Sequence, residues 1–316
     1  MNAERVADNC NRILKELETA IIGKEAVLRH ILVGVLANSH ILIEDYPGLA
    51  KTVIAKSLAA TLGCTFARVQ FTPDLLPADI TGTYIYNQKS GDFELRKGPI
   101  FTNILLADEI NRSPPKTQSA LLEAMQERQT TLDGRTHHLE NPFIVIATQN
   151  SIEFEGVYLL PEAQLDRFIM KLRIGYPDKN SEVEILRRRI TRGSDDFAIQ
   201  RIIDTTTLLE MQEAVEGVHA DEAVLSYITD IVRETRHHAQ VEVGASPRGS
   251  LAIAKLARAN AAVSGRDYVL PDDVKAVCSE ALAHRIIPKA ASWVRGFDPA
   301  GVIEETLRRV PVPKVD

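Results

Sequence analysis

Apolar and polar residues follow two different rhythms along this chain, and the change between them divides it into two parts. In the first part, short apolar runs rich in β-branched residues suit buried parallel strands, and segments with apolar residues three or four apart suit amphipathic helices. The predicted strands span residues 41–44, 65–70, 103–107 and 143–147. The predicted helices span residues 4–20, 24–37, 51–62 and 117–128. This alternation predicts a doubly wound α/β domain that ends near Pro177.

Two further segments have the pattern of β-hairpins. Residues 80–93 form two short β runs around a polar turn at residues 87–91, and residues 130–136 surround an Asp-Gly turn. Tyr84 and Tyr86 fall on the first hairpin, where they would either contact a partner or pack within the sheet. The first part of the chain is therefore expected to be an α/β core with two inserted hairpins.

After Pro177 the strand pattern nearly disappears and helical spacing dominates. Ser246-Pro247 and Leu270-Pro271 are typical helix starts, because proline is tolerated in the first turn. The predicted helices span residues 181–192, 208–215, 221–238, 247–263 and 271–285. We therefore predict an α/β domain over residues 1–178 and an all-helical domain with a C-terminal tail over residues 179–316.

Composition narrows the class of protein. A chain of 316 residues exceeds the usual size of one core, and its 45% hydrophobic and 25% charged residues are ordinary for a globular protein. No apolar run approaches the ~20 residues of a membrane span, and the first residues lack the apolar segment of a signal peptide, so a cytoplasmic protein is expected. The three widely spaced cysteines suggest neither a disulfide framework nor a zinc site, and the net charge of −6 argues against extensive nucleic-acid binding.

The first candidate for chemistry lies where the first strand ends. Pro47-Gly48-Leu49-Ala50-Lys51-Thr52 leads into a helix, whose N-terminus favours phosphate, while the lysine and the hydroxyl suit phosphate and Mg²⁺. The strict pattern G-x-x-x-x-G-K-[ST] is not met, because Asp45 and Ala50 occupy its glycine positions. Asp45 would weaken anion binding unless its side chain turns away, for example to cap a backbone amide. A right-handed backbone at Ala50 would accept the methyl group, whereas a left-handed one would not do so easily.

The second candidate is a pair of carboxylates at the end of the strand over residues 103–107. Asp108 can hold Mg²⁺ through water, and Glu109 can polarise an attacking water. A carboxylate pair at the end of a buried strand is hard to justify as packing. Together with the phosphate loop, it indicates an ATPase.

These residues, with the blocks that follow them, resemble the MoxR branch of the AAA+ ATPases, which are relatives of the magnesium-chelatase ATPase subunit. The resemblance covers nearly the whole chain and implies a P-loop AAA+ core, a parallel sheet flanked by helices and carrying inserted β-hairpins, followed by a small all-α lid domain. It is carried by Ile22-Gly23-Lys24, residues 47–52, 108–118 and 121–127, Ala147-Thr148-Gln149-Asn150, residues 161–168 and Ser246-Pro247-Arg248.

The resemblance also implies a role for each matching residue. Glu109 would activate the attacking water, and Asn150 would be the polar sensor of the γ phosphate. Arg167 would be the arginine finger that reaches the nucleotide of the neighbouring subunit, the alternative being a surface salt bridge with Asp166. Arg248 would be the second sensor, at the start of a lid helix. The residues expected at the nucleotide are Ile22 and Gly23 for adenine, Pro47, Gly48, Leu49, Ala50, Lys51 and Thr52 for phosphate, and Thr52 and Asp108 for Mg²⁺.

The predicted function is Mg²⁺-dependent ATP hydrolysis by a ring, expected to be a hexamer, that remodels or activates a protein partner. The resemblance suggests a partner that contains a von Willebrand factor A domain. Two alternatives keep the same fold: a nucleotide-binding scaffold that does not hydrolyse ATP, and a motor that acts on DNA. The presence of Glu109, Asn150 and Arg167 argues against the scaffold, and the acidic net charge argues against the motor.

Overall fold

The computed structural model describes residues 1–150, 157–294 and 296–314. Its centre is a parallel sheet in the order β2-β5-β8-β1-β9. The strands are β1 (Ile41–Glu44), β2 (Phe66–Gln70), β5 (Ile104–Asp108), β8 (Ile144–Gln149) and β9 (Met170–Leu172). The predicted fold class, an α/β core with a parallel sheet flanked by helices, is confirmed. The edge strand β9 was not predicted, because three residues are too few to show a periodic pattern.

The side chains of successive residues in the central strands point to opposite faces of the sheet, and a layer of helices covers each face. One face presents Ile41, Ile43, Ile104 and Ile146 to α1 (Ala3–Ala20), α2 (Glu25–Leu36) and α3 (Lys51–Thr61). The opposite face presents Leu42, Leu105 and Val145 to α5 (Pro115–Glu127). Because both faces are covered, the strands are apolar throughout, as expected for a parallel sheet.

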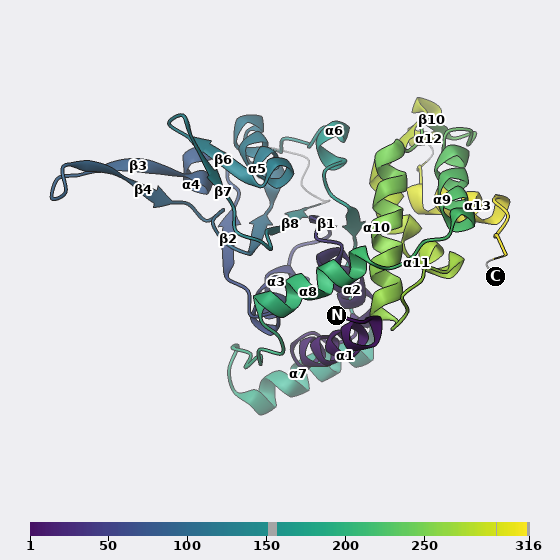
Figure 1. Ribbon diagram of the computed structural model, residues 1–316, viewed down its shortest axis with the longest axis horizontal. Helices are drawn as coiled ribbons and strands as arrows, with labels where there is room; N and C mark the ends of the chain where they lie inside the picture. Colours follow the sequence, from purple (N-terminus) through teal and green to yellow (C-terminus); the bar gives the residue numbers. More distant parts are fainter. Residues whose placement is uncertain (151–156, 295, 315–316) are drawn as a thin grey trace.

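Two antiparallel hairpins project from the core on the side opposite the C-terminal helices (Figure 1). One consists of β3 (Gly82–Asn87) and β4 (Asp92–Lys97), preceded by the short helix α4 (Pro77–Thr81). The other consists of β6 (Gln129–Leu132) and β7 (Arg135–His138). Both hairpins were predicted from their turn residues. The contact between them was not, because it depends on side chains distant in sequence.

The C-terminal part is mainly helical, as predicted, and it packs beside the sheet (Figure 1). A small antiparallel pair of β10 (Val241–Val243) and β11 (Ile287–Pro288) interrupts the helices. The helices are α7 (Lys179–Arg192), α8 (Thr205–Glu216), α9 (Glu222–Thr235), α10 (Pro247–Val263), α11 (Pro271–Leu282), η2 (Ala283–Arg285), α12 (Ala290–Val294) and α13 (Pro299–Arg309), with α6 (Glu162–Leu165) and η1 (Ile110–Arg112) in the core.

The boundary that we predicted after residue 178 falls in the loop between β9 and α7. Helix α8, which follows this boundary, contacts α1 and α2 of the preceding part as well as α10. One continuous apolar cluster therefore joins the helices on both sides of the boundary. The division into domains at this position stays a prediction.

Candidate functional site

The loop between β1 and α3 forms the base of a cavity. Gly48 and Ala50 both have positive φ angles, 81° and 56°, so the loop needs two left-handed residues. Ala50 is the N-cap of α3, and its methyl side chain cannot accept a hydrogen bond from the first N–H groups of the helix. The exposed N–H groups and the helix dipole there favour an anion.

Ala50 is therefore in the conformation that the sequence analysis considered the harder one for alanine. A left-handed conformation costs an L-residue roughly 1–2 kcal/mol relative to glycine. Glycine would adopt this conformation without that cost, so the Ala50 methyl group adds strain to the loop.

The side chain of Asp45 points away from the loop. Its Oδ2 accepts hydrogen bonds from the backbone N–H groups of Ile174 and Gly175, both at 2.6 Å, and its Oδ1 accepts one from Tyr46 at 2.8 Å. The side chain is buried. Asp45 therefore ties the start of the loop to the segment after β9, which is the capping arrangement that phosphate binding would require of an acidic residue here.

Asp108 and Glu109 reach the same cavity from the end of β5. Asp108 Oδ1 accepts a hydrogen bond from the Thr148 hydroxyl at 2.6 Å, and its Oδ2 accepts from the Arg68 guanidinium at 2.8 Å. Glu109 has a φ of 56°, and its backbone N–H donates to the Thr148 hydroxyl oxygen at 2.8 Å. Its Oε2 accepts from Gln70 at 2.7 Å and from Arg112 at 2.9 Å. Side chains of β2 and β8 therefore hold Asp108, and side chains of β2 and of η1 (Ile110–Arg112) hold the Glu109 carboxylate.

The cavity between these groups has a volume of about 390 Å³, and we call it the phosphate cavity. Burial lowers the pKa of Lys51, and the carboxylates of Asp45, Asp108 and Glu109 counteract this effect. Lys51 Nζ donates to the carbonyl oxygen of Asp45 at 2.5 Å. The structure brings together these predicted residues: Pro47, Gly48, Leu49, Ala50, Lys51, Thr52, Asp108, Glu109 and Asn150.

Arg68, Gln70 and Thr148 also belong to this site and were not predicted from the sequence. Arg68 and Thr148 line the phosphate cavity, and Gln70 holds Glu109. The strand pattern at residues 65–70 could have shown that the last residues of β2 lie beside the carboxylates, because parallel strands end at a common edge. Which of their side chains face the cavity depends on register.

Ile22 and Gly23 do not line the phosphate cavity. A Cβ atom added at Gly23 would lie 2.3 Å from the hydroxyl oxygen of Ser181, so Gly23 is packed against the start of α7. Lys24 Nζ donates to the carbonyl oxygens of Ile174 and Tyr176, both at 2.9 Å. These residues therefore border the segment after β9 that also binds Asp45.

Arg167 and Arg248 line a separate cavity of about 330 Å³, which we call the arginine cavity. Arg167 donates to the carbonyl oxygen of Leu122 on α5. The carboxylate of Asp166 pairs with Arg248 at 3.3 Å and with Arg285 at 2.7 Å, and not with Arg167. The salt bridge that we considered as the alternative role of Arg167 is thus absent from the described part of the chain.

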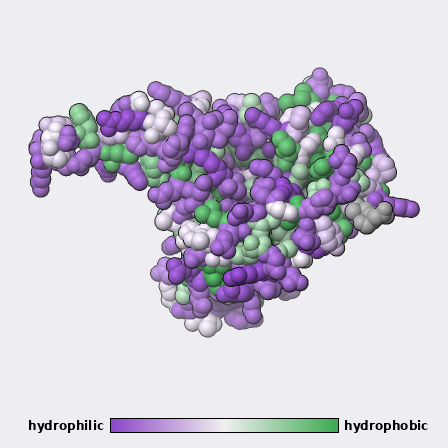
Figure 2. Space-filling model, viewed as in Figure 1, coloured by the Kyte–Doolittle hydropathy of each residue, from purple (hydrophilic) through white to green (hydrophobic). Residues whose placement is uncertain are grey.

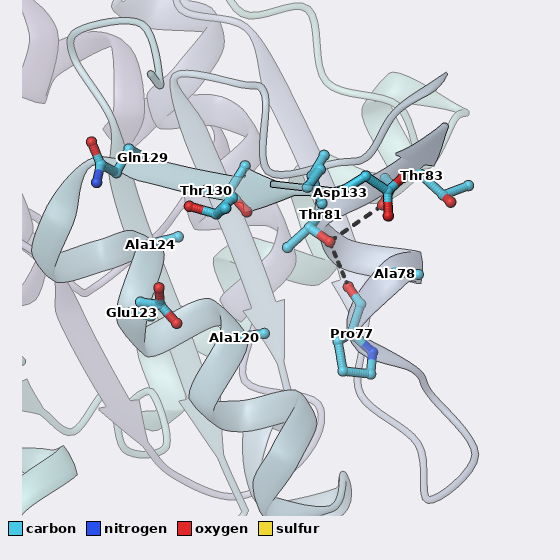
Figure 3. Close-up of a pocket in the computed structure, with 13 residues that line it drawn as sticks. Pro77, Ala78, Thr81, Thr83, Ala120, Glu123, Ala124, Gln129, Thr130 and Asp133 are labelled. Atoms are coloured by element: carbon cyan, nitrogen blue, oxygen red, sulfur yellow. Dashed lines mark hydrogen bonds between the residues drawn. The ribbon is translucent and has the colours of Figure 1, made fainter. Parts of the chain in front are cut away.

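A third cavity, of about 350 Å³, lies at the base of the two hairpins (Figure 3). Figure 3 shows Thr81 and Asp133 on one side and Glu123 and Ala120 of α5 on the other. The Thr81 hydroxyl donates to the carbonyl oxygen of Pro77 at 3.1 Å. Among the described residues, none lines both this cavity and the phosphate cavity.

The two tyrosines of the first hairpin have different environments. The Tyr84 hydroxyl lies 3.1 Å from His137 Nε2 on the second hairpin, so Tyr84 joins the hairpins by packing. Tyr86 is 56% exposed and forms an edge-to-face contact with Phe93, which is 67% exposed. Ile85, Tyr86 and Phe93 together form a surface that we call the apolar hairpin tip. Figure 2 shows this hairpin carrying apolar residues among hydrophilic ones.

The chain matches two protein-family models. Residues 40–170 match the family described as ATPase family associated with various cellular activities (AAA), and residues 233–300 match the AAA lid domain. No helix in the described residues is long and apolar enough to cross a membrane.

Similar proteins cover almost the full length of the chain. The uncharacterized protein YeaC of Bacillus subtilis is 44% identical, over 96% of this chain and 94% of that protein. Chaperone MoxR1 of Mycobacterium tuberculosis is 43% identical, over 96% of this chain and 82% of its own length. A crystal structure from Cytophaga hutchinsonii superposes with a TM-score of 0.92 at 42% identity, covering 99% of this chain and 97% of that one. The chain therefore belongs to the MoxR family of AAA+ ATPases.

Proposed function

We propose that this protein hydrolyses ATP with Mg²⁺ at sites shared between neighbouring copies of the chain. The observation that carries the proposal is the separation of the predicted site residues into two cavities. The phosphate cavity holds the loop, Lys51 and both carboxylates, whereas Arg167 and Arg248 line the arginine cavity. Within one copy, Arg68 in the phosphate cavity is engaged by Asp108, and neither Arg167 nor Arg248 lines this cavity to offset charge on the transferring phosphoryl group.

The groups in the phosphate cavity fit ATP and Mg²⁺. The N-terminus of α3 and Lys51 suit the phosphates, and the hydroxyl and carboxylate oxygens of Thr52 and Asp108 suit the magnesium ion. Bound magnesium would neutralise phosphate charge. Asn150 would contact the γ phosphate, and Ile22 and Gly23 would border the adenine.

Glu109 is the proposed base that polarises the attacking water. Its carboxylate is engaged by Gln70 and Arg112, so one of its oxygens already has two donors. The other oxygen stays available to accept from water. Gln70 and Arg112 would hold the carboxylate in a fixed orientation, which reduces the reorganisation needed during the reaction.

We propose a ring, expected to be a hexamer, because a site that needs groups from two surfaces of the same chain repeats from copy to copy. Such a heterologous contact closes into a ring when its rotation closes. Arg167 and Arg248 would then both act on the nucleotide of the next subunit. We also propose that residues 1–178 are the ATP-binding core and residues 179–316 are the lid.

The output is proposed to be the remodelling or activation of a protein partner. The relative from Mycobacterium tuberculosis is named a chaperone. The apolar hairpin tip is exposed on a projecting hairpin, which suits it to contact a polypeptide. A protein with a von Willebrand factor A domain is the partner that the family resemblance suggests.

The proposal is tested by ATP turnover measured against protein concentration for the parent chain, Glu109→Gln and Arg167→Ala. We expect specific activity to rise with concentration and each variant to lose about 10²-fold or more in turnover. Mixing the two variants should restore activity, since Arg167 of one copy would serve the intact Glu109 of the other. A parent chain that binds ATP but turns over no faster than Glu109→Gln would support the scaffold alternative. Tight, salt-sensitive binding to DNA would support the motor.

A further inference from the structure

Arg167 lies in the segment between α6 and β9, and residues of the lid form hydrogen bonds with this segment. Arg285, in η2, donates from Nε to Asp166 Oδ1 at 2.7 Å. Its Nη2 donates to the carbonyl oxygens of Asp166 at 3.2 Å and of Phe168 at 2.8 Å. Its Nη1 donates to the carbonyl oxygens of Ile169, at 3.2 Å, and Ala281. Four of these five contacts reach the residues immediately around Arg167.

Arg285 is suited to hold this segment in one geometry, because its hydrogen bonds are directional. The guanidinium is a rigid planar fork with five N–H donors, and its side chain is only 4% exposed. Burial lowers the pKa of Arg285, and the carboxylate of Asp166 counteracts this. The neighbouring His284 also donates from Nε2 to the Phe168 carbonyl oxygen, at 3.0 Å. The carbonyl groups before and after Arg167 are thus held by two consecutive residues of the lid.

The position of the Arg167 side chain depends on this backbone. The Arg167 guanidinium also donates a hydrogen bond to the carbonyl oxygen of Leu122 on α5. A displacement of a reacting group by about 1 Å can cost about 10²-fold in rate. A loose segment around residues 166–169 would therefore leave Arg167 present but misplaced.

We propose that Arg285 is a positioning residue that holds Arg167 in place for the ATP site of the neighbouring subunit. The inference rests on the proposed function, since it requires hydrolysis at a shared site. Arg285 is among the described residues that line the arginine cavity and not among those that line the phosphate cavity, so it does not contact the nucleotide site of its own subunit. The lid of one subunit thereby controls the turnover of the next through a buried set of hydrogen bonds.

The test is Arg285→Lys, which keeps the charge and loses the fork. We expect turnover to fall about ten- to a hundredfold while the KM for ATP changes less than about threefold, because nucleotide contacts are intact and Arg167 is displaced. Arg266→Lys is the matched control. Arg266 also makes a two-point contact with a buried carboxylate, that of Asp273, but entirely within the lid, so its loss should leave turnover unchanged.

Mixing experiments separate positioning from a general loss of folding. Arg285→Lys mixed with Glu109→Gln should regain activity, because the intact Glu109 of the first would meet a correctly held Arg167 of the second. Arg285→Lys mixed with Arg167→Ala should gain no activity, since neither copy presents a correctly placed Arg167. A change in structure that damaged the variant's own phosphate cavity would prevent rescue by Glu109→Gln and would overturn the proposal.

The outcomes distinguish this inference from the proposed function. If Glu109→Gln and Arg167→Ala fail to rescue each other, the shared site is refuted and this inference with it. If they do rescue each other while Arg285→Lys turns over like the parent, only the inference is refuted. If Arg285→Lys fails to fold by circular dichroism, Asp166→Asn removes the same contact from the other side. It must then show the same mixing pattern for the inference to stand.

Discussion

Replacement of Asp45 by alanine should destabilise the protein and weaken ATP binding. The buried carboxylate accepts hydrogen bonds at 2.6 Å from Ile174 and Gly175. Each buried N–H group left without a partner costs about 1–3 kcal/mol. We therefore expect Asp45→Ala to lower the free energy of unfolding by about 3–5 kcal/mol, measured by urea denaturation followed by circular dichroism. Asp8→Ala, at an exposed acidic position of α1, removes the same charge and should change it by less than about 0.5 kcal/mol.

ATP affinity distinguishes this account from a purely electrostatic one. Asp45 precedes the phosphate loop, and its carbonyl oxygen accepts from Lys51 Nζ. Freeing the start of the loop should raise the Kd for ATP about tenfold, equivalent to about 1.4 kcal/mol, when measured calorimetrically in a Glu109→Gln background. If the negative charge of Asp45 mainly repels phosphate, its removal would tighten binding. A lower Kd, or an unchanged free energy of unfolding, would refute the capping role.

Three further predictions concern the same region. Ala50→Gly should raise the free energy of unfolding by about 0.5–1 kcal/mol. The change removes the strain of a left-handed alanine, and this gain exceeds the loss from the greater conformational entropy of glycine in the unfolded state. A lower urea midpoint would contradict this. Burial lowers the pKa of His40 to about 4, and its Nδ1 accepts from the N–H of Val145, so the folded state holds it neutral. Its stability contribution is complete above pH 6.5 and is lost as pH falls from 6.5 towards 4, by about 3 kcal/mol in all; His40→Gln should flatten the pH dependence of unfolding over this window. Thr148→Val should lower ATP turnover about ten- to a hundredfold by releasing Asp108 and Glu109, and Thr148→Ser should retain most of it; equal rates for valine and serine would exclude this role.

The main strands and the long helices were predictable because their signals are local. Helix α10 begins and ends at the predicted residues, since Ser246 is an N-cap whose hydroxyl accepts from the N–H of Arg248 and Pro247 occupies the first turn. The apolar runs that became β1, β5 and β8 are buried on both faces. Strand β9 was not predicted because it is short. Helix α13 has the same start signal as α10, an N-cap residue, Asp298, followed by Pro299, so the sequence could have predicted it.

The phosphate loop and the carboxylate pair were recognised as one site because both follow apolar strands, and parallel strands bring their carboxyl ends to one edge. Their partners were not recognised. Arg68 and Gln70 lie on the same face of β2, and the register with β5, which pairs Gln70 with Asp108, brings Arg68 within reach of the Asp108 carboxylate. Sequence spacing carries no information on such cross-strand contacts.

The sequence by itself determined the α/β order, the helix starts, the chemistry of the phosphate loop and the family to which the chain belongs. These follow from residue type and from spacing along the chain, which act over a few residues. Only the tertiary structure decided where Asp45 points, that Ala50 is left-handed, and that Arg167 and Arg248 lie apart from the phosphate cavity beside Arg285. The hydrogen bonds of Asp45 and Arg285 join residues more than a hundred positions apart, so they exist only once the sheet and the lid have packed.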